Sequence, residues 1–299
     1  MTAVQILEVA NAVAAYGLPG TITELPRRPM DDDDWDVLLA LVQHQSLTGF
    51  LESAVADGAL PVDSDQAQQV ERAHDNALDV RHLAEDRLCA AALALGNEGI
   101  EYRVIGAASA AWLDYPSPGV RPFRESSLLV HPSERANAAR VLQDAALIGG
   151  GVCSAVVALY TPRFLDDAAA TELIWLEPDH LSLDELTLPT PPRPLRFLLA
   201  GLEAASGGDS LASFRDLAQM HLANDLDSAA TLALISEASI EAELAGAIKG
   251  CWKNLELADV TALSVWAQHH RDRVVPGVLT ASRLQRVHRV RKRIRTGKV

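Results

Sequence analysis

Residues 104–130 constrain the fold more than any other part of the chain. An apolar strand candidate over 100–105 ends at Gly106, and small residues then favour a short helix over 107–113. A loop rich in proline follows, and apolar residues over 126–130 predict a second strand. The order strand, glycine turn, helix, loop, strand predicts a small sheet with the helix packed on it.

The chain before this segment predicts helices. The acidic run Asp31 to Asp34 precedes Trp35, where carboxylates suit the positive end of a helix, with a metal site as the alternative. Asp63 or Ser64 can cap a second, longer helix, which the turn Gly96-Asn97-Glu98-Gly99 ends. Its apolar stripe consists of Val70, Ala73, Ala77, Val80, Ala84, Leu88, Ala91 and Leu95.

The chain after the second strand predicts further strands over 152–160 and 171–176, and Ser133 is expected to cap a helix. The proline-rich stretch Pro189 to Pro194 predicts a linker. Helices are expected beyond it, over 197–204 and 211–222, with two or three more up to Gln268.

These elements predict an α+β fold that is mostly helical. The chain has 299 residues, 48% of them hydrophobic, which is enough for a sizeable core in one to three domains. We expect an N-terminal helical region over 1–98, an α/β core with a small mixed sheet over 99–190, and a C-terminal helical region over 191–299.

Four short motifs of the chain resemble a known family. The bacterial family of uncharacterised nucleotidyltransferases usually shows Leu-Lys-Gly-x-Ala-Leu-Ala, then Tyr-Pro, Arg-Pro and Asp-x-Asp-Leu-Leu-Val. The matching stretches here are Val104-Ile105-Gly106-Ala107-Ala108-Ser109, Tyr115-Pro116, Arg121-Pro122 and Glu125-Ser126-Ser127-Leu128-Leu129-Val130. The resemblance spans about residues 30 to 270, with its detailed match at 106–130, and implies a nucleotidyltransferase-type core for the central region.

The resemblance also implies a nucleotide site. Nucleotidyl transfer displaces pyrophosphate from an NTP, and the enzyme mainly positions the triphosphate and neutralises its charge. Gly106 and Ser109, at a helix N-terminus, would receive the phosphates, and Arg121 would add a cation. Glu125 and Ser127, two residues apart on one strand, would share a face beside Mg²⁺.

A third carboxylate would complete this site. Glu172-Leu173-Ile174-Trp175 resembles the family's Asp-Leu-His-Trp strand, so Glu172 would join Glu125 as a catalytic and metal-binding residue.

The chain departs from the family at most of the charged positions. Ile105 stands in place of a lysine, Glu125 and Ser127 in place of two aspartates, Glu172 in place of a third, and Ile174 in place of a histidine. Glutamate is one methylene longer than aspartate, and serine removes a charge from the metal site. We therefore expect weak Mg²⁺ binding, because this ion prefers several anionic oxygens.

Each of these residues also has a purely structural interpretation. Gly106 and Ser109 can form a tight turn and a helix cap, and Glu125 can be an ordinary polar residue on a strand. Arg121 can be a surface or salt-bridging arginine.

Charge divides the chain into an acidic body and a basic end. The net charge is −14, yet eight Lys or Arg and no acidic residue lie between Arg283 and Val299, which leaves −22 on the rest. Apolar residues step by three and four through this end, which predicts a basic amphipathic helix. Such a helix can bind nucleic acid, an acidic partner or an anionic membrane, dock on the protein's own acidic body, or simply solvate the terminus.

The sequence predicts a cytoplasmic protein. No apolar run is long enough for a transmembrane segment, the first 18 residues lack a basic start, and three widely spaced cysteines fit reduced thiols.

Three functions follow as hypotheses. The first is a nucleotidyltransferase-like pseudoenzyme, a nucleotide- or partner-binding module with a degenerate metal site. The second is an active Mg²⁺-dependent transferase that uses Glu125 and Glu172 to move a nucleotide from an NTP to an acceptor. The third is a nucleic-acid-binding protein that acts through residues 283–299.

Overall fold

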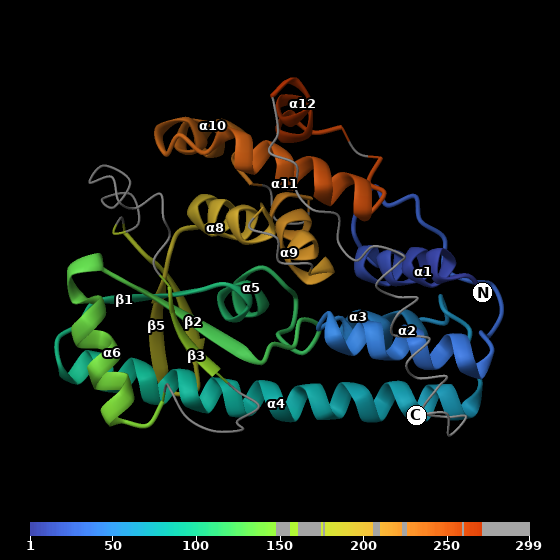
Figure 1. Ribbon diagram of the computed structural model, residues 1–299, viewed down its shortest axis with the longest axis horizontal. Coiled ribbons are helices and arrows are strands. Elements are labelled where there is room, and N and C mark those ends of the chain that lie inside the picture. The colour runs from blue at the N-terminus through green and yellow to red at the C-terminus, as the bar shows by residue number, and fades with distance from the viewer. Residues whose placement is uncertain are drawn as a thin grey trace, which may run out of the picture.

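The computed structural model describes residues 1–147, 156–160, 175, 177–205, 210–222, 226–258 and 260–270, with only the backbone at 156–160. This part of the chain is mostly helical and contains two small β-sheets, as an α+β fold requires. In Figure 1 the long helix α4 runs along the base of the molecule, beneath both the larger sheet and the N-terminal helices.

Two of the four N-terminal helices, α2 and α4, begin where the sequence predicts. The four helices are α1 (Ala3–Ala15), α2 (Asp32–His44), α3 (Thr48–Ala56) and α4 (Ser64–Asn97). Asp31 caps α2 by accepting the N–H of Asp34 at 3.0 Å, so the acidic run is a helix start. Asp63 caps α4 in a capping box with Gln66.

The larger sheet joins the two predicted strands. It orders β1 (Tyr102–Ile105), β2 (Glu125–Val130) and β3 (Val156–Tyr160), with β1 antiparallel and β3 parallel to β2. Helix α5 (Ala107–Leu113) begins directly after Gly106 and packs against β1 and β2. The predicted strand–turn–helix–strand arrangement is therefore confirmed.

Side chains of β2 alternate between two faces of this sheet. Ser126 faces α4, where its hydroxyl approaches the carbonyl of Ala84 at 3.5 Å, and Leu128 packs on the same side. Glu125, Ser127 and Leu129 point to the opposite side because strand side chains alternate.

Two predictions beyond β2 are wrong in detail. Ser133 lies inside a short 3-10 turn, and the His131 ring accepts its N–H. Helix α6 (Arg135–Asp144) has no side-chain cap.

The proline-rich stretch is not a linker, contrary to the second prediction. Pro189 pairs with His180 in the hairpin β4 (Asp179–Leu183) and β5 (Leu186–Thr190), and α8 (Arg193–Ala205) begins three residues after β5. A helix's first turn tolerates proline because its N–H groups have no helical partner.

The predicted strand 171–176 lies outside the described residues except for Trp175, which is in a turn. Residues 152–155 also lie outside them.

The C-terminal helices share a core with the N-terminal ones. They are α8, α9 (Leu211–Leu222), α10 (Ser228–Glu237), α11 (Glu241–Asn254) and α12 (Ala262–His269). One buried cluster runs from Ile6 of α1 to Ala267 of α12, and a second joins the sheet, α5, α6 and the hairpin. Helix α4 serves both, because Val70 packs in the first cluster and Leu88 in the second.

None of the described helices combines the length and the apolar composition that a membrane span requires. Cys89 and Cys251 are free thiols.

Candidate functional site

Gly106 makes a turn that glycine alone adopts readily. Its φ of 71° and ψ of −148° place it at the N-cap of α5, in a region that a Cβ makes unfavourable. Ser109 in the first turn of α5 is only 1% exposed, and its hydroxyl donates to the carbonyl of Gly106 at 3.0 Å. The structure thus gives Ser109 an internal contact.

Ser127 faces the glycine turn. It pairs with Ile105 across β1 and β2, and its Cβ and Oγ lie 4.0 Å from the point where a Cβ on Gly106 would stand. Glu125 lies two residues earlier on the same strand face, at the exposed start of β2. Gly106, Ser127 and Glu125 therefore gather on one side of the sheet, while Ile105 is buried in the core with 4% exposure.

Arg121 is held inside the protein and not on this sheet face. Its Nε and Nη2 donate to the two carboxylate oxygens of Asp216 on α9, both at 2.8 Å, and Tyr115 donates its hydroxyl to the same carboxylate at 2.8 Å. Burial lowers the pKa of the Arg121 guanidinium, but the charge and hydrogen bonds of Asp216, together with the nearby Tyr115 and Glu203, outweigh burial, and the pKa is raised. Arg121 is thus the salt-bridging arginine that the structural interpretation allows.

Glu203 is a carboxylate that the sequence analysis missed. It lies on α8 and accepts from the Ser213 hydroxyl at 3.5 Å. The residue is exposed on one side, while desolvation by the neighbouring elements raises the pKa of its carboxyl, and the charges of Asp216 and Glu125 raise it further. Helix α8 lies far from β2 in the sequence, so only the fold places these two glutamates close enough to repel each other.

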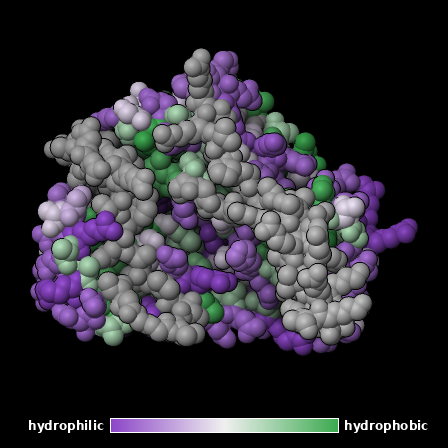
Figure 2. Space-filling view, in the orientation of Figure 1, coloured by the Kyte–Doolittle hydropathy of each residue, from purple (hydrophilic) through white to green (hydrophobic). Residues whose placement is uncertain are grey.

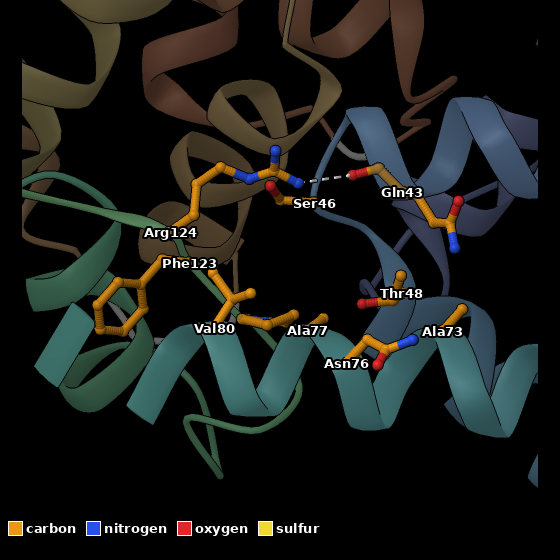
Figure 3. A pocket seen from close by; sticks show the side chains of 10 residues that line it. Gln43, Ser46, Thr48, Ala73, Asn76, Ala77, Val80, Phe123 and Arg124 are labelled. Atoms are coloured by element: carbon orange, nitrogen blue, oxygen red, sulfur yellow. Dashed lines mark hydrogen bonds between the residues drawn. The ribbon is translucent and has the colours of Figure 1, made fainter. Parts of the chain in front are cut away.

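A pocket of about 270 Å³ was also missed. It opens between the turn from α2 to α3, the middle of α4 and the segment that leads into β2 (Figure 3). Its lining residues are Gln43, Ser46, Thr48, Ala73, Asn76, Ala77, Val80, Pro122, Phe123 and Arg124.

Side chains that could bind a metal do not cluster in the part of the chain that the structure describes. No group of three or more His, Cys, Asp or Glu side chains there could hold a metal ion. Glu172, the third carboxylate of the predicted metal site, lies outside the described residues, as does the basic end at 283–299.

The described surface seen in Figure 2 is largely hydrophilic, and hydrophobic side chains are scattered over it. Comparison with protein-family models, with curated proteins and with solved structures finds no match for this chain. The family resemblance therefore rests on the residues of the chain alone.

Proposed function

We propose that the protein is a nucleotidyltransferase-like module with a degenerate metal site that binds a nucleotide or a partner without transferring a nucleotidyl group. The observation that carries the proposal is the position of Ser127 beside Gly106. In the family that the chain resembles, a metal-binding aspartate stands at this position. A neutral hydroxyl there leaves Glu125 as the carboxylate of this strand motif, and one carboxylate holds Mg²⁺ weakly.

The charges around this face also argue against catalysis. Phosphoryl and nucleotidyl transfer require cations that neutralise the charge of the triphosphate. Here Ile105 is buried in the place of a lysine, and Arg121 is already paired with Asp216. Glu125 and Glu203 add negative charge instead. A bare triphosphate would meet repulsion at this face unless a metal ion or the basic end at 283–299 compensated for it.

The experiment restores the missing carboxylate. We expect calorimetric titration of wild-type protein with ATP or GTP to show binding that Mn²⁺ improves by less than about twofold. Ser127→Asp should make nucleotide binding depend on Mn²⁺, with a gain of about tenfold, because a second anionic ligand completes the pair on β2. Ser133→Asp, the same charge change on an exposed turn, is the matched control.

Two outcomes would replace this proposal. Pyrophosphate release by wild type that Glu125→Gln abolishes would favour the active Mg²⁺-dependent transferase with Glu125 and Glu172. Absence of nucleotide binding in both wild type and Ser127→Asp, together with salt-dependent RNA binding that is lost on removal of residues 283–299, would favour the nucleic-acid-binding protein.

A further inference from the structure

The pocket beside Arg124 is separate from the glycine-turn face. Gly106, Glu125 and Ser127 do not line it, although Arg124 and Glu125 are neighbours in the sequence. The pocket has a volume of about 270 Å³, which is room for about nine waters at about 30 Å³ each. A small organic molecule would fill this volume.

Two backbone features shape the pocket wall. Ser46 follows α2 with a φ of 55°, and the N–H of Leu47 donates to the carbonyl of Val42 at 2.9 Å, so the chain turns sharply into α3. Gly49 then lets α3 approach the loop before β2, because a Cβ there would lie 2.4 Å from the carbonyl oxygen of Val120. The opening is left where α4 presents alanines instead of larger side chains.

The floor of the pocket is mostly apolar. Ala73, Ala77 and Val80 follow one another along α4, with Asn76 as the polar residue among them (Figure 3), and Pro122 and Phe123 also line the pocket. Such a floor suits a ring or a branched hydrocarbon group.

The rim supplies a cation. The exposed Arg124 guanidinium makes one long hydrogen bond, from Nη2 to the carbonyl of Gln43 at 3.4 Å. Among the described residues no carboxylate forms an ion pair with it. Its remaining N–H groups can therefore receive an anionic oxygen in a bidentate arrangement.

A buried hydroxyl also lies in the pocket wall. Thr48 is only 3% exposed, and its Oγ1 has no hydrogen-bond partner within the described chain. Most buried polar atoms have a partner, so an unpaired hydroxyl in a pocket wall is available to a ligand that enters the pocket. In Figure 3 this oxygen is turned toward the α4 side chains that form the floor.

We propose that this pocket binds a small organic anion, a carboxylate attached to an aromatic ring or a branched apolar group. Arg124 pairs with the carboxylate, Thr48 donates its hydroxyl to the ligand, and the alanines of α4 contact the apolar part. Asp75 and Asp79, exposed on α4 beside the lining residues, and Glu125 next to Arg124 disfavour a doubly charged group. A monoanionic carboxylate is therefore preferred to a phosphate monoester.

The test uses benzoate, phenyl phosphate and benzyl alcohol as probes of the full-length protein. We expect ligand-observed NMR titration to show that benzoate binds wild type more tightly than either of the others. Arg124→Gln should weaken benzoate binding at least about fivefold and leave benzyl alcohol unchanged, because it removes the ion pair and keeps the shape. Arg72→Gln, the same charge change on the exposed surface of α4, should have no effect.

A second variant tests the location. Ala77→Leu fills the floor with a residue that favours helix and should abolish binding of all three probes. Benzoate binding that is equal in wild type, Arg124→Gln and Ala77→Leu would overturn the site. Tighter binding of phenyl phosphate than of benzoate, with the same response to both variants, would overturn the carboxylate preference and identify a phosphate ester as the ligand. Failure of both anions to bind wild type would overturn the proposal altogether.

Discussion

At the scale of single residues, backbone geometry at Gly106 decides where the sheet face and α5 meet. Its φ of 71° and ψ of −148° fall in a region that costs about 1–3 kcal/mol for residues with a Cβ. Space is not the constraint, because the nearest neighbours of an added Cβ are Ser127 atoms at 4.0 Å. The role of Gly106 is therefore conformational.

We expect Gly106→Ala to lower the free energy of unfolding by about 1–3 kcal/mol. Gly96→Ala is the matched control, because Gly96 lies within α4 and an added Cβ meets nothing within 4 Å. That control should raise stability by about 0.5–1 kcal/mol, since alanine favours helix. Urea denaturation of the three proteins gives the comparison, and equal effects of the two substitutions would contradict this account.

Residue patterns predicted the local features of the site and not its long-range partners. The glycine turn, the shared face of Glu125 and Ser127, and the Asp63 cap follow from neighbours in the sequence. The partner of Arg121 does not, because Asp216 lies 95 residues away on α9. Nothing in the spacing of the chain distinguishes a phosphate-binding arginine from one that is paired inside the protein.

At the scale of elements, Asp216 fixes α9 to the loop between α5 and β2. Its carboxylate accepts two hydrogen bonds from Arg121 and one from Tyr115, and both partners are buried. Removal of one member would leave a charge in the interior without its partner, which is far more costly than loss of a surface pair.

We expect Asp216→Asn to reduce the free energy of unfolding by about 3–5 kcal/mol. Asp144→Asn is the control, because Asp144 pairs with Arg140 at 3.1 Å on the exposed surface of α6 and should cost less than about 1 kcal/mol. Thermal unfolding followed by circular dichroism measures both. A cost for Asp216→Asn no larger than the control's would mean that the buried bridge does not hold α9 in place.

Element boundaries were predictable at the aspartate caps and the glycine turns, and they were mistaken at Ser133 and at the prolines. Asp31 and Asp63 mark helix starts that the structure confirms. The stretch from Pro189 was mistaken for a linker because proline breaks central strands and helix interiors. In this chain it occupies a two-stranded hairpin and the approach to α8, where a missing N–H is tolerated.

At the scale of the whole molecule, the first and last helices of the described chain share one core, so stability depends on contacts between the two ends. His221 at the end of α9 belongs to this arrangement. It is 9% exposed, its ring lies 6.2 Å from that of Phe197 and 5.8 Å from that of Trp252, and neither ring nitrogen has a hydrogen-bond partner among the described residues.

Burial lowers the pKa of the His221 imidazole below its usual value of 6.5, because an apolar site disfavours the charged form. The unfolded chain therefore binds more protons than the folded one just below pH 6.5. The contribution of neutral His221 to stability is complete above that pH and is lost as the pH falls from 6.5 toward the lower value of the folded state. His74 has a pKa lowered by burial as well and acts in the same direction.

We therefore expect wild-type protein to lose stability between pH 7 and pH 5.5, and His221→Phe to lose less over the same interval, because the variant keeps an aromatic ring and has no proton to bind there. The limit for one site is about 1.4 kcal/mol per pH unit. Phe197→Leu is the control, since it weakens packing around the ring but leaves the imidazole in place, and should lower stability without flattening its pH dependence. Groups with raised pKa values, such as Glu203, act alike in all three proteins. Urea denaturation at several pH values gives the slope of the free energy of unfolding against pH for each protein. Equal slopes for wild type and His221→Phe would show that protonation of other groups causes the loss of stability.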